Sequence, residues 1–190
     1  METAGLVLAA GSGSRYGMPK ALVPYGGKLL VERAAETLRS AGVARSVVVL
    51  GASAPLALPH TTGYAETVIN PEWETGMASS LRAGLRTLVG TPAIAVVVLL
   101  VDMPEVTPLA VRRVSAHAAA DALVMGGYQG RRGHPVLLGR DHWDGVLATA
   151  TGDKGARDYL RAHAGVVRVV EVGDVAGDLD LDVPELNPDA

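Results

Sequence analysis

The sequence predicts an α/β fold in which a mostly parallel sheet of strands is covered by helices. Continuous apolar runs, the longest of them Ala93–Val101, are typical of strands buried on both faces. These runs alternate along the chain with segments whose apolar residues recur every three or four positions, as amphipathic helices require. The length of 190 residues fits one domain, so we expect a single domain over residues 1–190.

The first fifty residues predict one strand–helix–strand unit. Gly5–Ala10 is a short apolar run that stops at Gly11, and Ser46–Leu50 is a second such run. Between them, apolar residues recur at helical spacing over 29–41, and Gly42 follows as a C-cap.

The rest of the chain continues the alternation. We expect strands over 65–70, 93–101, 122–125, 135–138 and 166–172, and helices over 77–89, 108–120 and 153–163. Residues 126–133 are rich in glycine and indicate a flexible turn. The strands on either side of this turn then predict an antiparallel extension at the sheet edge.

The composition excludes several classes of protein. There is no cysteine, which excludes disulfides, thiolate zinc sites and thiol nucleophiles. With 48% hydrophobic and 19% charged residues, the chain is globular rather than disordered. A net charge of −3 and only 4% aromatic residues argue against a general nucleic-acid binder. No apolar run is long enough to span a membrane, so we expect a cytoplasmic protein with no nucleic-acid or membrane partner.

The loop after the first strand has the features of a phosphate site. Gly11, Gly13 and Gly17 allow the backbone to approach a ligand and to aim N–H groups at phosphate oxygens. Arg15 and Lys20 add two cations, and Lys20 is one of only three lysines in the chain. The alternative interpretation is a flexible surface loop with incidental charges.

Two well-known phosphate loops do not fit these residues. A P-loop requires Gly-Lys followed by Ser or Thr, whereas Lys20 lies between Pro19 and Ala21. A dinucleotide fingerprint requires an acidic residue at the end of the second strand, where Leu50-Gly-Ala52 stands instead. Neither pattern explains the segment.

Carboxylates follow the longest predicted strand and recur near the C-terminus. Asp102 comes directly after Ala93–Val101, at the sheet edge where Mg²⁺ can be held by carboxylates and substrate phosphates. Asp178, Asp180 and Asp182 alternate with apolar residues, so an extended segment would present all three on one face. The alternatives are an Asp102 that caps the following turn and a tail whose acids face solvent.

Two further segments offer groups for binding. Ser79 and Ser80 lie in the first turn of a predicted helix, where N–H groups and hydroxyls can receive an anion or a base edge. Helix N-capping alone would also explain these serines. His134 follows the pair Arg131-Arg132 beside the predicted turn. A structural histidine and a solvated hairpin tip are the alternatives there.

Taken together, these residues resemble the MobA/MocA-like nucleotidyltransferases, within the wider superfamily of sugar-phosphate nucleotidyltransferases. The segment Leu8–Lys20 is similar to the signature loop of that family. The resemblance continues through Gly76–Ser80, Val101–Pro104, Gly133–Pro135, Gly152–Ala156 and Asp180–Asp182. The pair Ala9-Ala10 and the Gly-His-Pro segment resemble the branch that transfers a cytidylyl rather than a guanylyl group. The chain departs from the family pattern at Tyr16, Val183 and Leu186.

The resemblance implies a fold, a reaction and a set of site residues. The fold would be a three-layer, Rossmann-like, mostly parallel sheet of the nucleotide-diphospho-sugar transferase type with a small antiparallel extension. The reaction would be Mg²⁺-dependent transfer of a nucleoside monophosphate, preferably CMP from CTP, onto a phosphorylated acceptor such as molybdopterin, with release of pyrophosphate. By the same resemblance, the catalytic residues would be Arg15, Lys20 and Asp102, and Mg²⁺ would be held by Asp102 and Asp182. The nucleotide would be bound by Leu8, Ala9, Ala10, Gly11, Gly13, Ser14, Gly17, Ser79 and Ser80. The acceptor would be bound by Arg132, His134, Pro135 and Asp153.

Two functions of other classes stay open beside this one. The first is an NAD(P)H- or flavin-linked oxidoreductase of heteroaromatic compounds, because some family-like proteins are associated with such conversions. The second is a noncatalytic maturation factor that binds a nucleotide or cofactor and delivers it to a molybdenum hydroxylase. Bound flavin or NADPH oxidation would favour the first, and tight binding without pyrophosphate release would favour the second.

Overall fold

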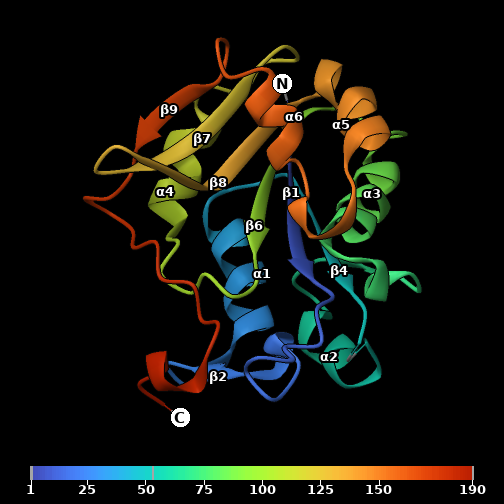
Figure 1. Ribbon diagram of the computed structural model, residues 1–190, viewed down its shortest axis with the longest axis vertical. Helices are drawn as coiled ribbons and strands as arrows, with labels where there is room; N and C mark the ends of the chain where they lie inside the picture. The colour runs from blue at the N-terminus through green and yellow to red at the C-terminus, as the bar shows by residue number, and fades with distance from the viewer. Residues whose placement is uncertain (1, 53, 190) are drawn as a thin grey trace.

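A computed structural model describes residues 2–52 and 54–189 of the chain. Its strands are β1 (Glu2–Ala9), β2 (Pro24–Tyr25), β3 (Lys28–Leu29), β4 (Arg45–Leu50), β5 (Glu66–Ile69), β6 (Ala93–Leu100), β7 (Leu123–Tyr128), β8 (Arg131–Gly139) and β9 (Arg168–Glu171). Seven of them form one sheet in the order β5-β4-β1-β6-β8-β7-β9, with β6 at its centre (Figure 1). The two others, β2 and β3, form a small antiparallel pair. The predicted α/β fold is therefore confirmed.

The sheet is mostly parallel. Strands β5, β4, β1 and β6 run in one direction, whereas β8 is antiparallel to both β6 and β7 and supplies the predicted antiparallel extension. Strand β9 pairs with β7 in parallel and adds one more strand beyond this extension. Because the parallel strands end at the same edge, the loops that follow β1 and β6 converge there.

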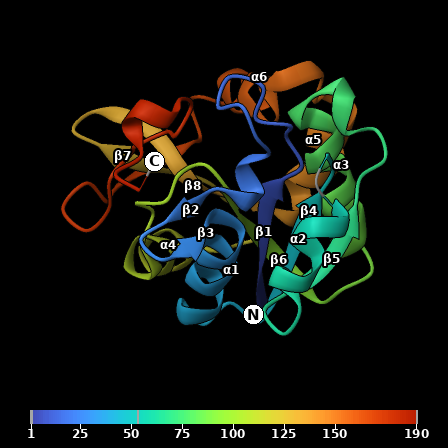
Figure 2. The same cartoon turned by 90° about the horizontal axis from the view of Figure 1, so that it is seen from below.

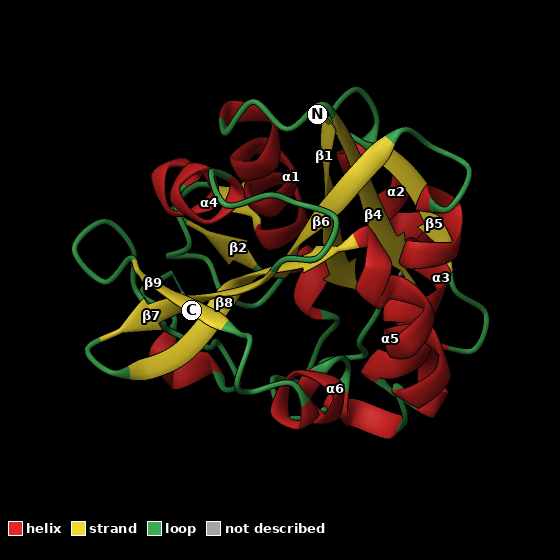
Figure 3. Cartoon of the chain, turned by 90° about the horizontal axis from the view of Figure 1, so that it is seen from above, coloured by secondary structure: helices red, strands yellow, loops and turns green. Residues whose placement is uncertain are grey.

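Helices cover both faces of the sheet (Figure 3). The helices are α1 (Leu30–Ser40), α2 (Ala54–Thr61), α3 (Met77–Leu88), α4 (Pro108–Ser115), α5 (Trp143–Thr149) and α6 (Arg157–Ala162). Alternate residues of β1 divide between the faces: Val7 packs with α1, α2 and α4, and Leu6 packs with α3, α5 and α6. This alternation explains why the strand is a continuous apolar run, since both of its faces are buried.

Three predicted elements differ from the structure. Helix α4 ends at Ser115 rather than at residue 120, and turns follow it, after which the Ala120 carbonyl accepts from Asp141 N. Most of segment 126–133 lies in β7 and β8, so the predicted flexible turn is wrong except at the hairpin tip. The predicted helix over 153–163 begins later, with α6, after a separate 3₁₀ turn.

Two helices had no counterpart in the prediction. Helix α2 contains Pro55 and Pro59, and no helix was predicted there because proline is disfavoured inside helices. Helix α5 is short and begins at the buried Trp143, whose ring nitrogen donates to the Leu138 carbonyl. Within residues 2–52 and 54–189, no helix combines the length and the apolar character needed to cross a membrane.

Candidate active site

The loop between β1 and residue 20 is shaped by its glycines. Gly13 has a φ of +64°, and a Cβ on it would lie 1.9 Å from the Met18 carbonyl oxygen. Gly17 has a φ of +92°, and its N–H donates to the Gly13 carbonyl at 2.8 Å. Both positions require a left-handed backbone that L side chains rarely adopt. The loop thereby leaves β1, closes a tight turn and returns to place Lys20 at the carboxyl edge of the sheet.

This loop forms one wall of a cavity of about 430 Å³. Of the residues predicted to bind the nucleotide, six line this cavity: Leu8, Ala10, Gly11, Gly13, Ser14 and Ser80. The predicted catalytic residues Arg15, Lys20 and Asp102 line it too, as does Asp182. The sequence-based expectation that these distant segments meet therefore agrees with the geometry.

A cluster of charges lies at the border of this cavity. Lys20 Nζ donates to Asp102 Oδ2 and to Asp182 Oδ1, both at 2.7 Å, and lies 3.7 Å from Asp180 Oδ1. Arg15 donates to the second oxygen of Asp182, again at 2.7 Å. The Lys20 side chain is only 13% exposed, whereas that of Arg15 is 75% exposed. Lys20 is therefore the inner cation of the cluster and Arg15 the outer one.

The C-terminal segment reaches the cluster through one buried residue. Leu181 is fully buried, and its N–H donates to the Asp102 carbonyl at 2.9 Å. Asp180 and Asp182 flank it and both approach Lys20, as the alternation in the sequence predicts. Tyr16 accepts a hydrogen bond from Asn187 and ties the glycine loop to the same segment, which Figure 2 shows beside the loop.

The pKa shifts in the cluster follow from this packing. Burial opposes the charge of Lys20, but its hydrogen bonds to Asp102 and Asp182 hold its pKa above the ordinary value. The hydrogen bond from Lys20 lowers the pKa of Asp182. Burial and the Asp102 charge raise the pKa of Asp180. The two loop cations thus compensate carboxylates that would otherwise repel one another.

The carboxylates fit a divalent cation. Asp102, Asp180 and Asp182 can each offer one oxygen, and these oxygens lie within 4.8 Å of one another. Carboxylate oxygens are the ligands that Mg²⁺ and other hard cations prefer. Asp180 was not among the predicted ligands, although its alternation with Asp182 in the sequence was the signal that could have identified it.

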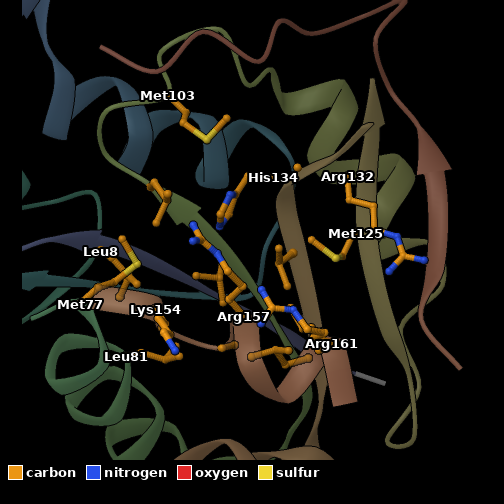
Figure 4. Close-up of a pocket in the computed structure, with 18 of the residues that line it drawn as sticks. Leu8, Met77, Leu81, Met103, Met125, Arg132, His134, Lys154, Arg157 and Arg161 are labelled. Atoms are coloured by element: carbon orange, nitrogen blue, oxygen red, sulfur yellow. The ribbon is translucent and has the colours of Figure 1, made fainter. Parts of the chain in front are cut away.

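A second cavity, of about 520 Å³, adjoins the first. Leu8, Met77 and Leu100 line both cavities, so the two share a wall. Asp180 lines the second cavity, whereas Asp102 and Asp182 line the first, which places the carboxylate cluster at their border. Two residues predicted to bind the acceptor, Arg132 and His134, line the second cavity (Figure 4).

The remaining predicted site residues lie elsewhere. Ser79 lines neither cavity, because its hydroxyl donates to the Glu72 and Gly76 carbonyls and accepts from Asn70 in a buried turn. Ala9, Gly17 and Pro135 are likewise absent from both cavity walls. Asp153 lines the first cavity rather than the second, where the acceptor was expected.

Several lining residues were not anticipated as site residues. The 3₁₀ turn before α3 brings Trp73 and Glu74 to the first cavity. Gly76 follows with a φ of +105°, and a Cβ there would lie 2.5 Å from the Gly152 backbone. This close approach joins the start of α3 to the segment that precedes α6, and no local sequence pattern predicts it.

A glycine loop that lines a cavity beyond the carboxyl ends of parallel strands, with Lys20 and Arg15 beside it, is an arrangement typical of α/β proteins that bind phosphorylated ligands. The chain belongs to the MobA-like NTP transferase domain family, whose model matches residues 5–167.

Two kinds of relative accompany this match. The nicotine blue oxidoreductase of Paenarthrobacter nicotinovorans is 35% identical over 191 residues, covering 95% of this chain and 92% of its own. The crystal structure of Rv0371c from Mycobacterium tuberculosis H37Rv has a TM-score of 0.86 at 31% identity, covering 98% of this chain and 95% of that one. A structure of Rv0371C in complex with manganese has a TM-score of 0.79 at 28% identity, covering 95% and 94%.

Proposed function

We propose that this protein is a metal-dependent nucleotidyltransferase that moves a nucleoside monophosphate from an NTP onto a phosphorylated acceptor and releases pyrophosphate. One observation carries the proposal: the carboxylates of Asp102, Asp180 and Asp182 meet Lys20 at the border between two cavities. A transfer between two ligands needs such a border, because the donor phosphorus and the acceptor oxygen must come within reach of each other.

The residues present fit a divalent cation, which Asp102 and Asp182 would hold with help from Asp180. When bound, Mg²⁺ or Mn²⁺ would neutralise charge on the phosphate oxygens. The manganese complex of the similar protein Rv0371C supports metal binding by a protein of this fold. Lys20 and Arg15 would then turn from the carboxylates to the triphosphate, because the loop that carries them also lines the donor cavity.

The transfer step requires alignment more than proton transfer. An acceptor phosphate is ionised at pH 7, so its oxygen attacks the α-phosphorus of the NTP without a general base. The new bond joins this oxygen to the α-phosphorus, and the bond from the α-phosphorus to the bridging oxygen of the β-phosphate breaks. Pyrophosphate leaves with the electron pair. Lys20 would stabilise the growing charge, and the glycine loop would hold the phosphates through its N–H groups.

We further propose CTP as the donor and molybdopterin as the acceptor. Its support is the resemblance of Ala9-Ala10 and of Gly133–Pro135 to the cytidylyl-transferring branch of the family. The second cavity, lined by Arg132 and by His134, is the place proposed for the acceptor. A molybdenum hydroxylase that receives the product is the corresponding partner.

Calorimetric titration with CTP, GTP, ATP and UTP, each with Mg²⁺ and in a parallel series with Mn²⁺, tests the proposed function. We expect CTP to bind most tightly and its affinity to fall when the metal is left out. Tightest binding of another NTP would overturn the cytidylyl assignment alone. Absence of binding to all four would overturn nucleotidyl transfer.

A second candidate function is oxidoreduction of a heteroaromatic compound. The observation that favours it is the 35% identity to a protein named nicotine blue oxidoreductase. The charge cluster favours transfer instead, because Lys20 with three carboxylates serves phosphate chemistry and has no evident use in hydride transfer. NADPH oxidation by the purified protein in the presence of such a compound would establish the oxidoreductase. A maturation factor without catalysis would bind CTP tightly and release no pyrophosphate.

A further inference from the structure

The second cavity combines an apolar wall with arginine side chains. Its volume of about 520 Å³ lies within the usual range for small organic ligands. Three methionines line it, Met77, Met103 and Met125, and the apolar wall continues with Leu81, Val98, Val136, Leu138 and Leu160. Methionine side chains are polarisable and adapt to the shape of a flat ring system. The apolar wall therefore suits the body of a ligand. Other residues of the cavity must then select the charge of that ligand.

Most of the charged side chains around the cavity already have partners. Lys154 and Arg161 both contact Asp158, at 2.9 and 3.2 Å. Asp178 is paired with Arg131 at 2.7 Å. Asp180 lies 3.7 Å from Lys20 in the charge cluster. These groups therefore contribute little free charge to the cavity.

Two guanidinium groups differ from the rest. Across residues 2–52 and 54–189, neither Arg132 nor Arg157 has an ion pair with any carboxylate. Both line the cavity, Arg132 from β8 and Arg157 from α6. An arginine whose guanidinium has no ion pair among the described residues is ready to bind a carboxylate, sulfonate or phosphate in a bidentate manner.

Arg157 is the one of the two that extends toward His134. Figure 4 shows it extending from α6 toward His134 on β8. Burial lowers the pKa of His134 to about 4, and the charges of Asp102 and Arg157 act on it in opposite directions. His134 therefore lies within the fields of both groups and is neutral at pH 7. Arg157 thus brings positive charge to the part of the cavity where His134 lies.

We propose that the second cavity binds a flat apolar ligand that bears an anionic group, with its body against the methionines and its anion on the Arg157 guanidinium. That this ligand is the acceptor rests on the function proposed above. In that role, Arg157 would set the specificity for an anionic acceptor and would turn the anion toward the donor cavity.

Two fluorescent probes test the cavity directly. 8-Anilinonaphthalene-1-sulfonate has a flat apolar body with one anionic group, and N-phenyl-1-naphthylamine has the same body without the anion. We expect Arg157→Gln to weaken binding of the sulfonate about 10- to 100-fold, as the loss of a charge-assisted hydrogen bond implies, and to leave binding of the neutral probe unchanged. Equal affinity of Arg157→Gln and the unmodified protein for the sulfonate would overturn the proposal.

Arg161→Gln is the matched control, because Arg161 lies on the same helix and lines the same cavity but is already paired with Asp158. Similar losses in both variants would contradict a specific contact with Arg157 and would indicate a diffuse field. Met103→Trp, in the loop after β6, fills the cavity and should abolish binding of both probes. Retention of both probes in a folded Met103→Trp protein would place them elsewhere and would also overturn the proposal.

Nucleotide binding separates this inference from the proposed function. Arg157 does not line the first cavity, so Arg157→Gln should bind CTP with Mg²⁺ as the unmodified protein does. Once an acceptor is known, the KM of Arg157→Gln for that acceptor should be higher than that of the unmodified protein, whereas its KM for CTP should be unchanged. If the probes behave as expected and no NTP binds, the cavity assignment stands and nucleotidyl transfer fails. If NTPs bind and the affinity of the sulfonate probe is the same with and without the Arg157→Gln substitution, only the cavity assignment fails.

Discussion

Lys20 Nζ lies 2.7 Å from Asp102 Oδ2, although the two residues are 82 positions apart in the chain. The contact joins the glycine loop after β1 to the end of the neighbouring strand β6. Lys20 also donates a hydrogen bond to Asp182, so one ammonium group connects three segments of the sequence. It occupies the space between the carboxylates where a divalent cation would bind. The proposed function would therefore couple the binding of metal and nucleotide to the position of Lys20.

Replacing Lys20 by Met should reduce nucleotidyl transfer. The loss of one positioned cation removes a few kcal/mol of transition-state stabilisation, so we expect kcat/KM for CTP to fall by roughly 10²-fold or more. Lys28→Met is the control, because Lys28 pairs with Glu36 on the surface and lines neither cavity. Rates of pyrophosphate release from the two variants give the comparison. Equal losses would show that the effect is not specific to Lys20.

The same Lys20→Met variant should bind metal more tightly in the absence of nucleotide. In the unmodified protein the ammonium must leave Asp102 and Asp182 before a cation can take both carboxylates. Removing this charge should raise the affinity for Mn²⁺ about tenfold or more, because like charges at this distance repel strongly in a partly buried site. Electron paramagnetic resonance of free Mn²⁺ measures the affinity. Unchanged or weaker binding would contradict the competition between Lys20 and the metal.

Gly13→Ala should disrupt the phosphate loop. Its Cβ would lie 1.9 Å from the Met18 carbonyl oxygen, and its φ of +64° is unfavourable for alanine. We expect a loss of about 2 kcal/mol or more in the free energy of unfolding, together with weaker NTP binding. Gly90→Ala is the matched control, because its Cβ would meet no atom within 4 Å. Urea unfolding and nucleotide titration check both variants, and similar behaviour of the two would refute the steric argument.

Protonation of His134 should make the free energy of unfolding depend on pH. Burial lowers its pKa to about 4 in the folded protein, whereas a histidine in an unfolded chain takes up its proton near pH 6.5. Between these values the unfolded chain binds more protons, so the free energy of unfolding falls as the pH is lowered from about 6.5 to 4. The loss attributable to His134 is on the order of 1–3 kcal/mol.

His134→Gln removes this titration. Urea unfolding of the variant and the unmodified protein at several pH values between 7 and 4.5 isolates the contribution, because the carboxylates that titrate in the same range are common to both proteins. We expect a smaller loss of stability in the variant. Parallel pH profiles would mean that His134 is not held neutral by its surroundings.

Local patterns in the sequence predict the core of the fold well. Each of these elements carries its own pattern of buried residues: β1, β4 and β6 are continuous apolar runs, and α1 and α3 have apolar residues at helical spacing. Such a pattern can be recognised without knowledge of the rest of the chain. Strand β6, which precedes Asp102, is central because both of its faces are apolar. The glycine loop and its two cations are continuous in sequence, so their place at the sheet edge was predictable too.

Other features depend on contacts between distant segments. Gly126 and Gly127 suggested a turn, yet they lie in β7, where a Cβ would meet the His134 carbonyl or the Val169 side chain at 2.8 Å. These glycines therefore serve close approach of strands rather than a turn. Arg157 gave no signal in the sequence, because the lack of a partner for its guanidinium becomes visible only when the cavity around it is known.

Pyrophosphate release with CTP, Mg²⁺ and molybdopterin, compared between the unmodified protein and Asp102→Ala, tests nucleotidyl transfer at this site. Asp144→Ala, an exposed position on α5, serves as the control. We predict release that requires all three components and that falls at least about 10²-fold in Asp102→Ala, because this carboxylate would hold the metal at the border of the two cavities. Release that is unchanged by Asp102→Ala, or a mixture that yields no pyrophosphate with the unmodified protein, would contradict the account.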